Sequence, residues 1–412
     1  MPDYIKRYHV LIILMMAYTT MWIDKGLISL AIIPIGNEFN LSKTQAGMLM
    51  SAYSLGYALI SLPGGILSDL FGYKKVIVGC MVGAAIFCFL FPFCSVLILF
   101  ILIRFLLGVS HGSIPSASAK AIALNYSREQ RVMIQSIWFM GGSIGGCIAA
   151  WVGARLITID WTFAYYFVAV CYIISGLLIL CTLKNIKQPQ NHEKTSTPGR
   201  KKSILTLLTD RNVIILAVSV FAFNLVLNGS IWFPSFLKQK FNLSLIDIGY
   251  IQSINAFIGI ITPLLCGFLC SKLFNNCENI FIFISSVITA ACFLMFTLSS
   301  SVIVVVASFA LSMLTSMFTF ITIKNLPHKI IAEEFIGTSM GVITAISSFG
   351  GFVAPTLLGF IIDSSGNSFG YAYYTLAAII LFGGIVCLFG IKLKIQEKKI
   401  RYRQKSYKSN CY

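Results

Sequence analysis

Apolar runs of about twenty residues recur along the whole chain, and short polar connectors separate them. A membrane-spanning helix needs about 20 apolar residues to cross the hydrocarbon core. Long apolar runs indicate helices, because a membrane barrel consists of shorter strands with alternating polarity. The pattern predicts an all-α membrane protein with about twelve transmembrane helices, at 9–33, 45–67, 76–94, 96–120, 132–155, 161–183, 212–236, 247–270, 279–298, 301–325, 337–361 and 369–391.

The second half of the chain repeats the first. Phe-Asn-Leu-Ser stands at 39–42 and recurs 202 residues later at 241–244. At the same spacing and without gaps, Gly47 corresponds to Gly249 and Gly65 to Gly267. Six spans per half leave both repeats in the same orientation, and such parallel repeats form a binding site near the bilayer midplane. We therefore expect two pseudo-symmetric six-helix bundles with their connecting segments, at 1–183 and 212–391, a cytoplasmic linker at 184–211 and a basic cytoplasmic tail at 392–412.

Composition and charge support a membrane protein. Only 11% of the residues are charged, whereas soluble proteins carry about 25%. The net charge of +17 comes mainly from basic residues in the linker, the tail and alternate connectors. This distribution follows the positive-inside rule and predicts cytoplasmic termini, so it does not indicate a nucleic-acid partner. The twelve cysteines are scattered without metal-type spacing, so we expect no disulfide framework, metal site or cofactor.

A glycine-rich segment with an acid and two lysines follows the second predicted span. It contains Gly65, Asp69, Gly72, Lys74 and Lys75. Glycines allow helices to approach closely and permit tight turns, and the acid can pair with a base or cap a helix end. The segment resembles the loop signature of the major facilitator superfamily, which implies the fold of that superfamily and a gating role for these five residues.

Two charged residues lie inside the first span, at Asp24 and Lys25. Charges at membrane depth are costly and mark functional sites by default. Adjacent helix positions diverge by about 100°, so the two side chains cannot share one face. In the functional interpretation, Asp24 exchanges a proton and Lys25 attracts an anionic substrate. The structural alternative is a buried ion pair with Arg104 that holds helices together.

The fourth span carries Arg104 and His111, seven residues apart and therefore on roughly one helix face. Histidine titrates near neutrality and suits a proton relay. The alternative is a histidine that is hydrogen-bonded between packed helices. Pro115, just beyond, can loosen the helix locally.

The stretch from Ile23 to Lys75, together with the fourth span, resembles the anion:cation symporter family, which includes hexonate, phthalate and vesicular glutamate transporters. The resemblance implies proton coupling at Asp24. The family commonly has an acid where this chain has His111, so the second acid of the family's proton pathway does not carry over. Because histidine titrates near neutrality, we assign His111 as the second coupling residue. It also implies substrate contacts for the second-span tyrosines, Tyr53 and Tyr57.

The second half supplies neutral polar residues within its spans. We assign substrate binding to Lys25, Tyr53, Tyr57 and Arg104 from the first half, and to Asn224, Asn228, Asn255 and Ser347 from the second. Polar side chains also connect helices structurally, which is the alternative for each residue of the second half.

These features favour a secondary active transporter that imports a small organic anion, with proton-coupled alternating access. The alternatives are proton-coupled efflux of drugs or metabolites and sodium-coupled anion uptake. Efflux antiporters of the superfamily usually carry a proline in the fifth span, where this chain has the proline-free segment 141–146. No catalytic motif indicates an enzyme. Very short connecting loops are typical of a bacterial protein, so we expect the inner membrane of a bacterium. We also expect a monomer.

Overall fold

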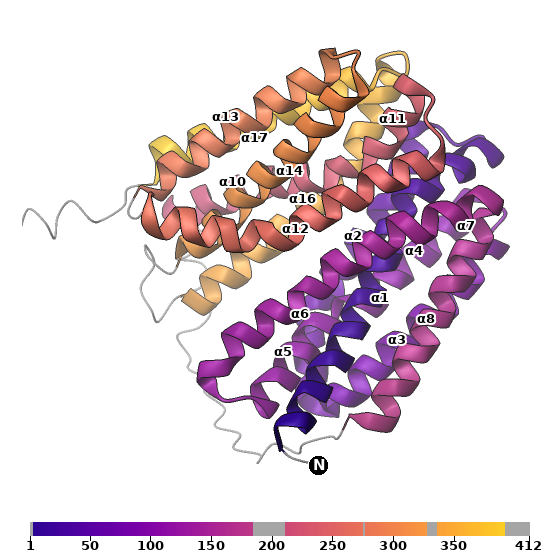
Figure 1. The fold of residues 1–412 in the computed structure, drawn as a ribbon, viewed down its shortest axis with the longest axis vertical. Coiled ribbons are helices and arrows are strands. Elements are labelled where there is room, and N and C mark those ends of the chain that lie inside the picture. The colour runs from indigo at the N-terminus through magenta and orange to yellow at the C-terminus, as the bar shows by residue number, and fades with distance from the viewer. Residues whose placement is uncertain (1–2, 184–210, 275–276, 328–335, 392–412) are drawn as a thin grey trace, which may run out of the picture. The chain divides into compact units, whose positions relative to one another are not determined.

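The first half of the chain folds into helices joined by short turns. The computed structural model describes residues 3–183, 211–274, 277–327 and 336–391 (Figure 1). The helices of the first half are α1 (Asp3–Glu38), α2 (Lys43–Phe71), α3 (Tyr73–Leu90), α4 (Leu97–Gly112), α5 (Ile114–Asn125), α6 (Arg128–Ile148), α7 (Ala154–Ile159) and α8 (Trp161–Thr182), with the short segments η1 (Phe91–Phe93) and η2 (Ala149–Gly153).

The second half is also helical wherever the structure describes it. Its elements are α10 (Arg211–Gly229), η3 (Ser230–Trp232), α11 (Phe233–Phe241), α12 (Leu245–Lys272), α13 (Glu278–Leu298), α14 (Val302–Asn325), α16 (Ile336–Ser364) and α17 (Phe369–Gly390). Within the described ranges, 11 helices are long and apolar enough to cross a membrane, or up to 12 with one bent pair counted as a span. The predicted all-α membrane fold with about twelve spans is thus confirmed.

Several spans are built from more than one helical piece, which the hydrophobic pattern does not reveal. The fourth span divides at Ser113 into α4 and α5, two residues before Pro115. The seventh span passes from α10 through η3 into α11, whose second residue is Pro234. The bent pair is α2, which turns by 52° between Lys43–Ser61 and Pro63–Phe71. Proline lacks the amide donor that a helix interior needs, so these divisions follow from the sequence locally.

The repeated Phe-Asn-Leu-Ser segment forms the same turn twice. Asn40 and Asn242 both adopt a left-handed conformation with φ of 50°, which asparagine tolerates better than most residues. The serine two positions later then caps the next helix. Ser42 accepts from the Gln45 amide, and Ser244 accepts from the Asp247 amide. The repeat seen in the sequence is therefore a helix-stop and helix-start signal in both halves.

Contacts divide the chain into two units. Unit 1 consists of Met1–Glu193, Asn228–Ile261 and Gly351–Ala372, and unit 2 of Lys194–Leu227, Thr262–Gly350 and Tyr373–Tyr412. Unit 1 thus contains the first six predicted spans together with one end of several helices from the second half. Most of the predicted linker and all of the predicted tail lie outside the described residues.

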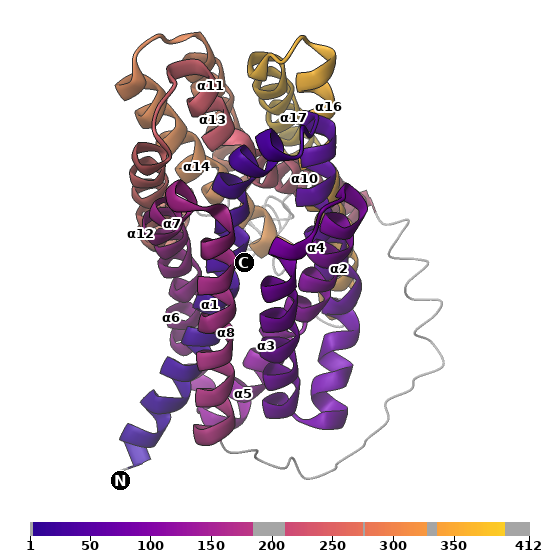
Figure 2. The same ribbon diagram turned by 90° about the vertical axis from the view of Figure 1, so that its right-hand side faces the viewer.

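The helices of unit 1 pack in a few close pairs. α1 packs against α6 and α8, α2 against α4, and α3 against both α4 and α8 (Figure 2). Unit 2 contains the close pair α13 and α14. The site described below depends on the crossings among α1, α2, α4 and α8.

Glycines permit the close crossing of α2 and α4. A Cβ atom at Gly108 would overlap the Tyr53 carbonyl oxygen and lie 2.8 Å from the Tyr57 amide, and one at Gly56 would overlap the Phe105 carbonyl oxygen. These neighbours are backbone atoms, so they cannot move aside without shifting a helix. Replacement of Gly108 by a larger residue must therefore separate the two helices.

We expect Gly108→Ala to lower the free energy of unfolding by about 1–3 kcal/mol, the usual cost of overpacking. The matched control is Gly79→Ala on α3, where a Cβ would meet nothing within 4 Å. The melting temperatures of the two purified variants are compared, with size-exclusion chromatography after heating as the readout of the protein that stays folded. Equal melting temperatures for the two variants would contradict the proposed close crossing.

Candidate functional site

Asp24 on α1 and Arg104 on α4 form a buried ion pair. The Arg104 Nη1 atom lies 3.2 Å from Asp24 Oδ1 and 3.5 Å from Oδ2. Both side chains are inaccessible to solvent, with 0% of Asp24 and 1% of Arg104 exposed. This geometry is the buried ion pair that the sequence left open as the structural alternative for Asp24. Each of the two groups compensates the charge of the other. Breaking such a pair by removing one partner is strongly unfavourable, because it leaves a buried charge unpaired.

His111 is hydrogen-bonded through both ring nitrogens. Its Nδ1 lies 2.9 Å from the Tyr53 hydroxyl, and its Nε2 lies 2.7 Å from the Tyr172 hydroxyl. A neutral imidazole has one donor and one acceptor, and a tyrosine hydroxyl can serve as either. The ring therefore connects α4 to α2 and α8 in either tautomer.

The ion pair and the histidine adjoin each other. His111 Nδ1 lies 4.0 Å from Asp24 Oδ2, and the Arg104 guanidinium lies 5.1 Å from the centre of the Tyr53 ring. Arg104 and His111 share a face of α4, as their spacing predicts, and that face is directed at Asp24. The arrangement brings one carboxylate, one guanidinium, one imidazole and two phenols together in the interior of the first half.

Lys25 makes no hydrogen bond or ion pair with this cluster in the part of the chain that the structure describes. Its Nζ atom lies 4.4 Å from the centre of the Trp22 ring, and the side chain is partly exposed. Within the described residues, Lys25 forms no ion pair, whereas Arg104 is paired. Neighbouring positions on α1 therefore separate, with Asp24 inside the helix packing and Lys25 on another face, as the helix geometry predicts.

The two tyrosines predicted to contact substrate occupy different environments. The Tyr53 and Tyr57 rings stack with 6.3 Å between their centres, so they share a face of α2 as predicted. Tyr53 is buried and its hydroxyl is bonded to His111, while Tyr57 is only partly buried. In this conformation, Tyr53 supports the histidine.

Several polar side chains of unit 1 have buried atoms with no partner among the described residues, and Asn255 and Arg104 are two of them. Both side-chain atoms of the Asn255 amide and the Nε atom of Arg104 make no hydrogen bond. Most buried polar atoms in proteins have a hydrogen-bond partner, so such atoms indicate groups that bind a ligand or water. Asn255 on α12 is the repeat counterpart of Tyr53 on α2, so both halves carry a polar side chain at this position of the repeat.

The other polar residues assigned to the second half are distributed over both units. In unit 2, Asn224 donates a hydrogen bond to the buried Ser347 hydroxyl. In unit 1, Asn228 lies against Gly351, where a Cβ would come within 3.1 Å of Nδ2. Asn224 and Ser347 thus connect two helices, α10 and α16, which is the structural alternative for that pair.

The segment predicted to have a gating role forms an ion pair within unit 1. Asp69, close to the end of α2, accepts a hydrogen bond from Lys120 Nζ at 2.7 Å, and Lys120 also reaches the Ser68 carbonyl oxygen at 3.0 Å. Gly72 has a φ of 84°, a conformation that glycine adopts readily, and it separates α2 from α3. The motif residues Gly65, Lys74 and Lys75 lie at the end of α2 and in the first turn of α3.

Sequence reasoning missed Tyr172 and Lys120 as partners of the predicted site residues. It also missed Asp363, whose carboxylate accepts hydrogen bonds from the first turn of α2. Tyr172 lies on α8, 61 residues from the histidine to which it bonds. No local spacing signals this contact, because it depends on how α8 packs. For Asp363, the available signal was an acid two residues beyond the predicted span 337–361, in a chain with only 14 acidic residues.

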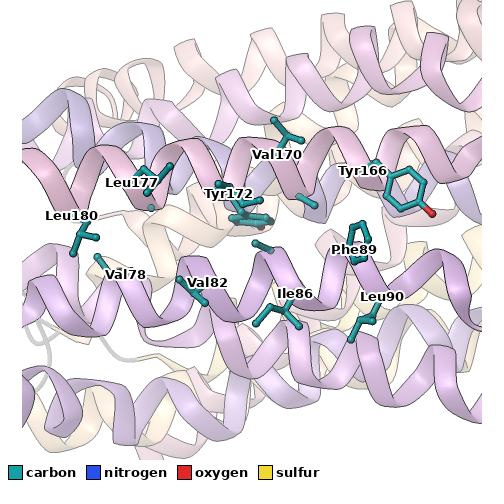
Figure 3. A pocket seen from close by; sticks show the side chains of 14 residues that line it. Val78, Val82, Ile86, Phe89, Leu90, Tyr166, Val170, Tyr172, Leu177 and Leu180 are labelled. Carbon is teal, nitrogen blue, oxygen red and sulfur yellow. The ribbon is translucent and has the colours of Figure 1, made fainter.

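A separate apolar groove lies between α3 and α8, as Figure 3 shows. Val82, Ile86, Phe89 and Val170 line it, and Tyr172 contributes to its wall. Val82 and Val170 are each 52% exposed. The groove is lined by apolar side chains and two tyrosines, without a charged side chain among its lining residues. Its apolar lining is that of a helix face in contact with lipid.

Comparison with known proteins agrees with this architecture. The family model described as Major Facilitator Superfamily matches residues 10–355. The chain is 25% identical to a hexuronate transporter of Bacillus subtilis (strain 168), with 91% of each chain covered. It is 23% identical to a quinolone resistance transporter of Acinetobacter baumannii, with 94% of each covered.

Among solved structures, the fold is similar to that of a bacterial homologue of the human lysosomal transporter Spinster. The TM-score is 0.77 at 17% identity, and the match covers 93% of this chain and 95% of the other. This likeness concerns the fold alone. With the family match over most of its length, the chain belongs to the major facilitator superfamily and is a transporter, not an enzyme.

Proposed function

We propose that this transporter imports a small organic anion, such as a sugar acid or another carboxylate, together with a proton. The observation that carries the proposal is the buried Asp24–Arg104 pair beside His111. A carboxylate can be neutralised by a proton, whereas a guanidinium stays charged. When Asp24 binds a proton, Arg104 loses its counter-ion and becomes able to attract the carboxylate of a substrate.

This coupling follows from electrostatics alone. With Asp24 charged, Arg104 is compensated and a substrate anion gains little from approaching it. With Asp24 protonated, the anion replaces the missing negative charge, so proton and substrate favour each other's binding. Reciprocal coupling of this kind is a thermodynamic necessity once the two sites share one cation. Asp24 is also the single acid in the middle of any predicted span.

Lys25 would supply a second positive charge for the substrate. Its ammonium has no carboxylate partner within the described residues. Asn255, which belongs to the same structural unit, has a side-chain amide without a hydrogen-bond partner among those residues. A charged group that attracts the anion and an amide that binds hydroxyls suit a sugar acid. The hexuronate transporter among the relatives supports this substrate class.

Proton-coupled efflux is the second candidate, and the quinolone resistance relative favours it. Two cationic residues inside the spans, Lys25 and Arg104, disfavour transport of cationic drugs. The proline-free segment 141–146 also departs from the usual efflux pattern.

The deciding experiment uses the full-length protein in proteoliposomes with an imposed pH gradient. We expect accumulation of a radiolabelled hexuronate or hexonate that stops when the gradient is dissipated. A matched preparation with a sodium gradient tests the other coupling ion, and a fluorescent quinolone tests efflux. Gradient-driven quinolone movement without movement of any acid would overturn the proposal.

We infer the membrane orientation from charge. Both termini and the basic linker would face the cytoplasm, which places the turns at 39–42 and 241–244 on the outer side. A bacterial inner membrane and a monomeric state complete the proposal. Accessibility of tags on the two termini to an impermeant protease checks the orientation.

We expect Lys25→Gln to raise the KM for the anion about tenfold or more, because a charged hydrogen bond contributes about 1.5–3 kcal/mol. The matched control, Lys25→Arg, keeps the charge and should change KM much less. Initial uptake rates over a range of substrate concentrations separate KM from the maximal rate. An unchanged KM in the glutamine variant would exclude Lys25 from substrate binding.

A further inference from the structure

The end of α16 contacts the start of α2 within unit 1. The Asp363 carboxylate accepts hydrogen bonds from the Lys43 amide at 2.9 Å, the Thr44 amide at 2.8 Å and the Thr44 hydroxyl at 2.6 Å. The partners are 319 or 320 residues apart in sequence. One side chain from the second half of the chain thus binds the first turn of a helix from the first half.

This contact adds to a cap that α2 already has. The first amides of any helix lack partners inside the helix. The Ser42 hydroxyl accepts a hydrogen bond from the Gln45 amide. Asp363 supplies acceptors for two other amides of the first turn, those of Lys43 and Thr44. A negative charge at a helix N-terminus is also favoured by the helix dipole. The interaction is therefore a charge-assisted cap provided by a distant helix.

Close packing reinforces the same crossing of α2 and α16. A Cβ at Gly47 would overlap the Pro355 carbonyl oxygen, and one at Gly359 would overlap the Lys43 carbonyl oxygen. The Ser51 hydroxyl accepts a hydrogen bond from the Thr356 hydroxyl at 2.8 Å. The contact therefore extends over about two turns of α2, with Asp363 at one end and Ser51 at the other.

The repeat counterpart of Gly47 forms a second crossing of this kind. A Cβ at Gly249 on α12 would overlap the Ala150 carbonyl oxygen and lie 2.5 Å from the Ala154 Cβ. Arg155 donates a hydrogen bond to the Tyr250 hydroxyl at 2.6 Å. The two crossings each join a helix of the first half to one of the second. Both lie near the turns at 39–42 and 241–244, on the face predicted to be outer.

We propose that Asp363 is a conformational latch that holds this face of the transporter closed. Alternating access requires the two halves to separate at one face while they join at the other. Separation here must break the three hydrogen bonds of Asp363 and expose the first turn of α2. The proposal rests on the alternating access in the proposed function, and it is independent of the substrate and the coupling ion.

Hydrogen–deuterium exchange of the full-length protein in nanodiscs, without substrate, tests the latch. The variant is Asp363→Asn, and the matched control is Asp160→Asn. Asp160 caps its own helix, α8, by accepting a hydrogen bond from the Thr162 amide at 2.8 Å. Both substitutions remove a charged cap, but only that of Asp363 joins the two halves of the chain.

We expect Asp363→Asn to accelerate exchange about tenfold in peptides from both crossings, including 43–51 and 150–155, as loss of one charge-assisted hydrogen bond predicts. The control should affect only the start of α8. Acceleration confined to the first turn of α2 would overturn the latch, because it would show a local cap and no opening of the face. Since substrate is absent, this result is separate from any failure of the transport assay.

A milder variant distinguishes opening of the crossing from misfolding of the protein. Ser51→Ala removes the acceptor of the Thr356 hydroxyl, within the same crossing, and leaves Asp363 in place. We expect a smaller acceleration, of a few-fold, in the same two peptides. Unchanged exchange at 150–155 in both variants would show that the two crossings open independently, and it would overturn a latch for the whole face.

Discussion

Replacement of Asp24 by asparagine is expected to abolish proton-driven accumulation of the substrate while sparing part of its binding and exchange. Asparagine keeps an acceptor for Arg104 but cannot bind and release a proton. The guanidinium then stays uncompensated through the whole cycle, so an anion can still bind to it. The substrate no longer depends on the proton, and the gradient performs no work on it.

Proteoliposomes measure both quantities. Uptake under an imposed pH gradient reports accumulation, and counterflow with substrate inside the vesicles reports exchange without a gradient. The matched control is Asp247→Asn, which changes an exposed acid at the start of α12 and should leave accumulation intact. Full accumulation by Asp24→Asn would remove Asp24 from the coupling role.

The second large effect concerns stability. We expect Asp24→Asn alone to lower the free energy of unfolding by about 3–5 kcal/mol, because it leaves the Arg104 charge buried without a counter-charge. Arg104→Gln should cost less, since the buried carboxylate can become neutral by binding a proton, whereas arginine cannot lose one. The double variant removes both charges and should be more stable than the sum of the single costs predicts.

A double-mutant cycle measures this coupling directly. Denaturant titration in mixed micelles gives the unfolding free energy of the parent protein, the two single variants and the double variant. Additive costs would show that the two charges do not interact, contrary to the 3.2 Å contact between them.

His111 shows where physical reasoning from the sequence ends. Its spacing from Arg104 correctly predicts that both face the same way, and both converge on Asp24. The sequence leaves a relay and a structural histidine as alternatives. The hydrogen bonds to Tyr53 and Tyr172 give the ring a structural role and also place it beside the carboxylate. Its part in proton transfer stays a prediction.

The spans and turns of this protein can be derived from the sequence alone. Apolar runs define the spans because the bilayer sets their length, and the repeated turn defines the duplication because asparagine and serine stop and start helices locally. The 100° step between Asp24 and Lys25 predicts that they separate. Each of these inferences uses only interactions between residues that are close in the chain.

The partners of the charged side chains, in contrast, depend on how the helices pack. Asp24 pairs with Arg104, 80 residues away, and Asp363 caps α2 across 320 residues. Helical periodicity gives the face on which a side chain lies, but the neighbour on that face depends on how helices cross. Those crossings depend on the small residues Gly47, Gly56, Gly108 and Gly359, which allow backbones to touch at certain points. The charge pairs and the latch therefore follow from packing, which local sequence pattern does not encode.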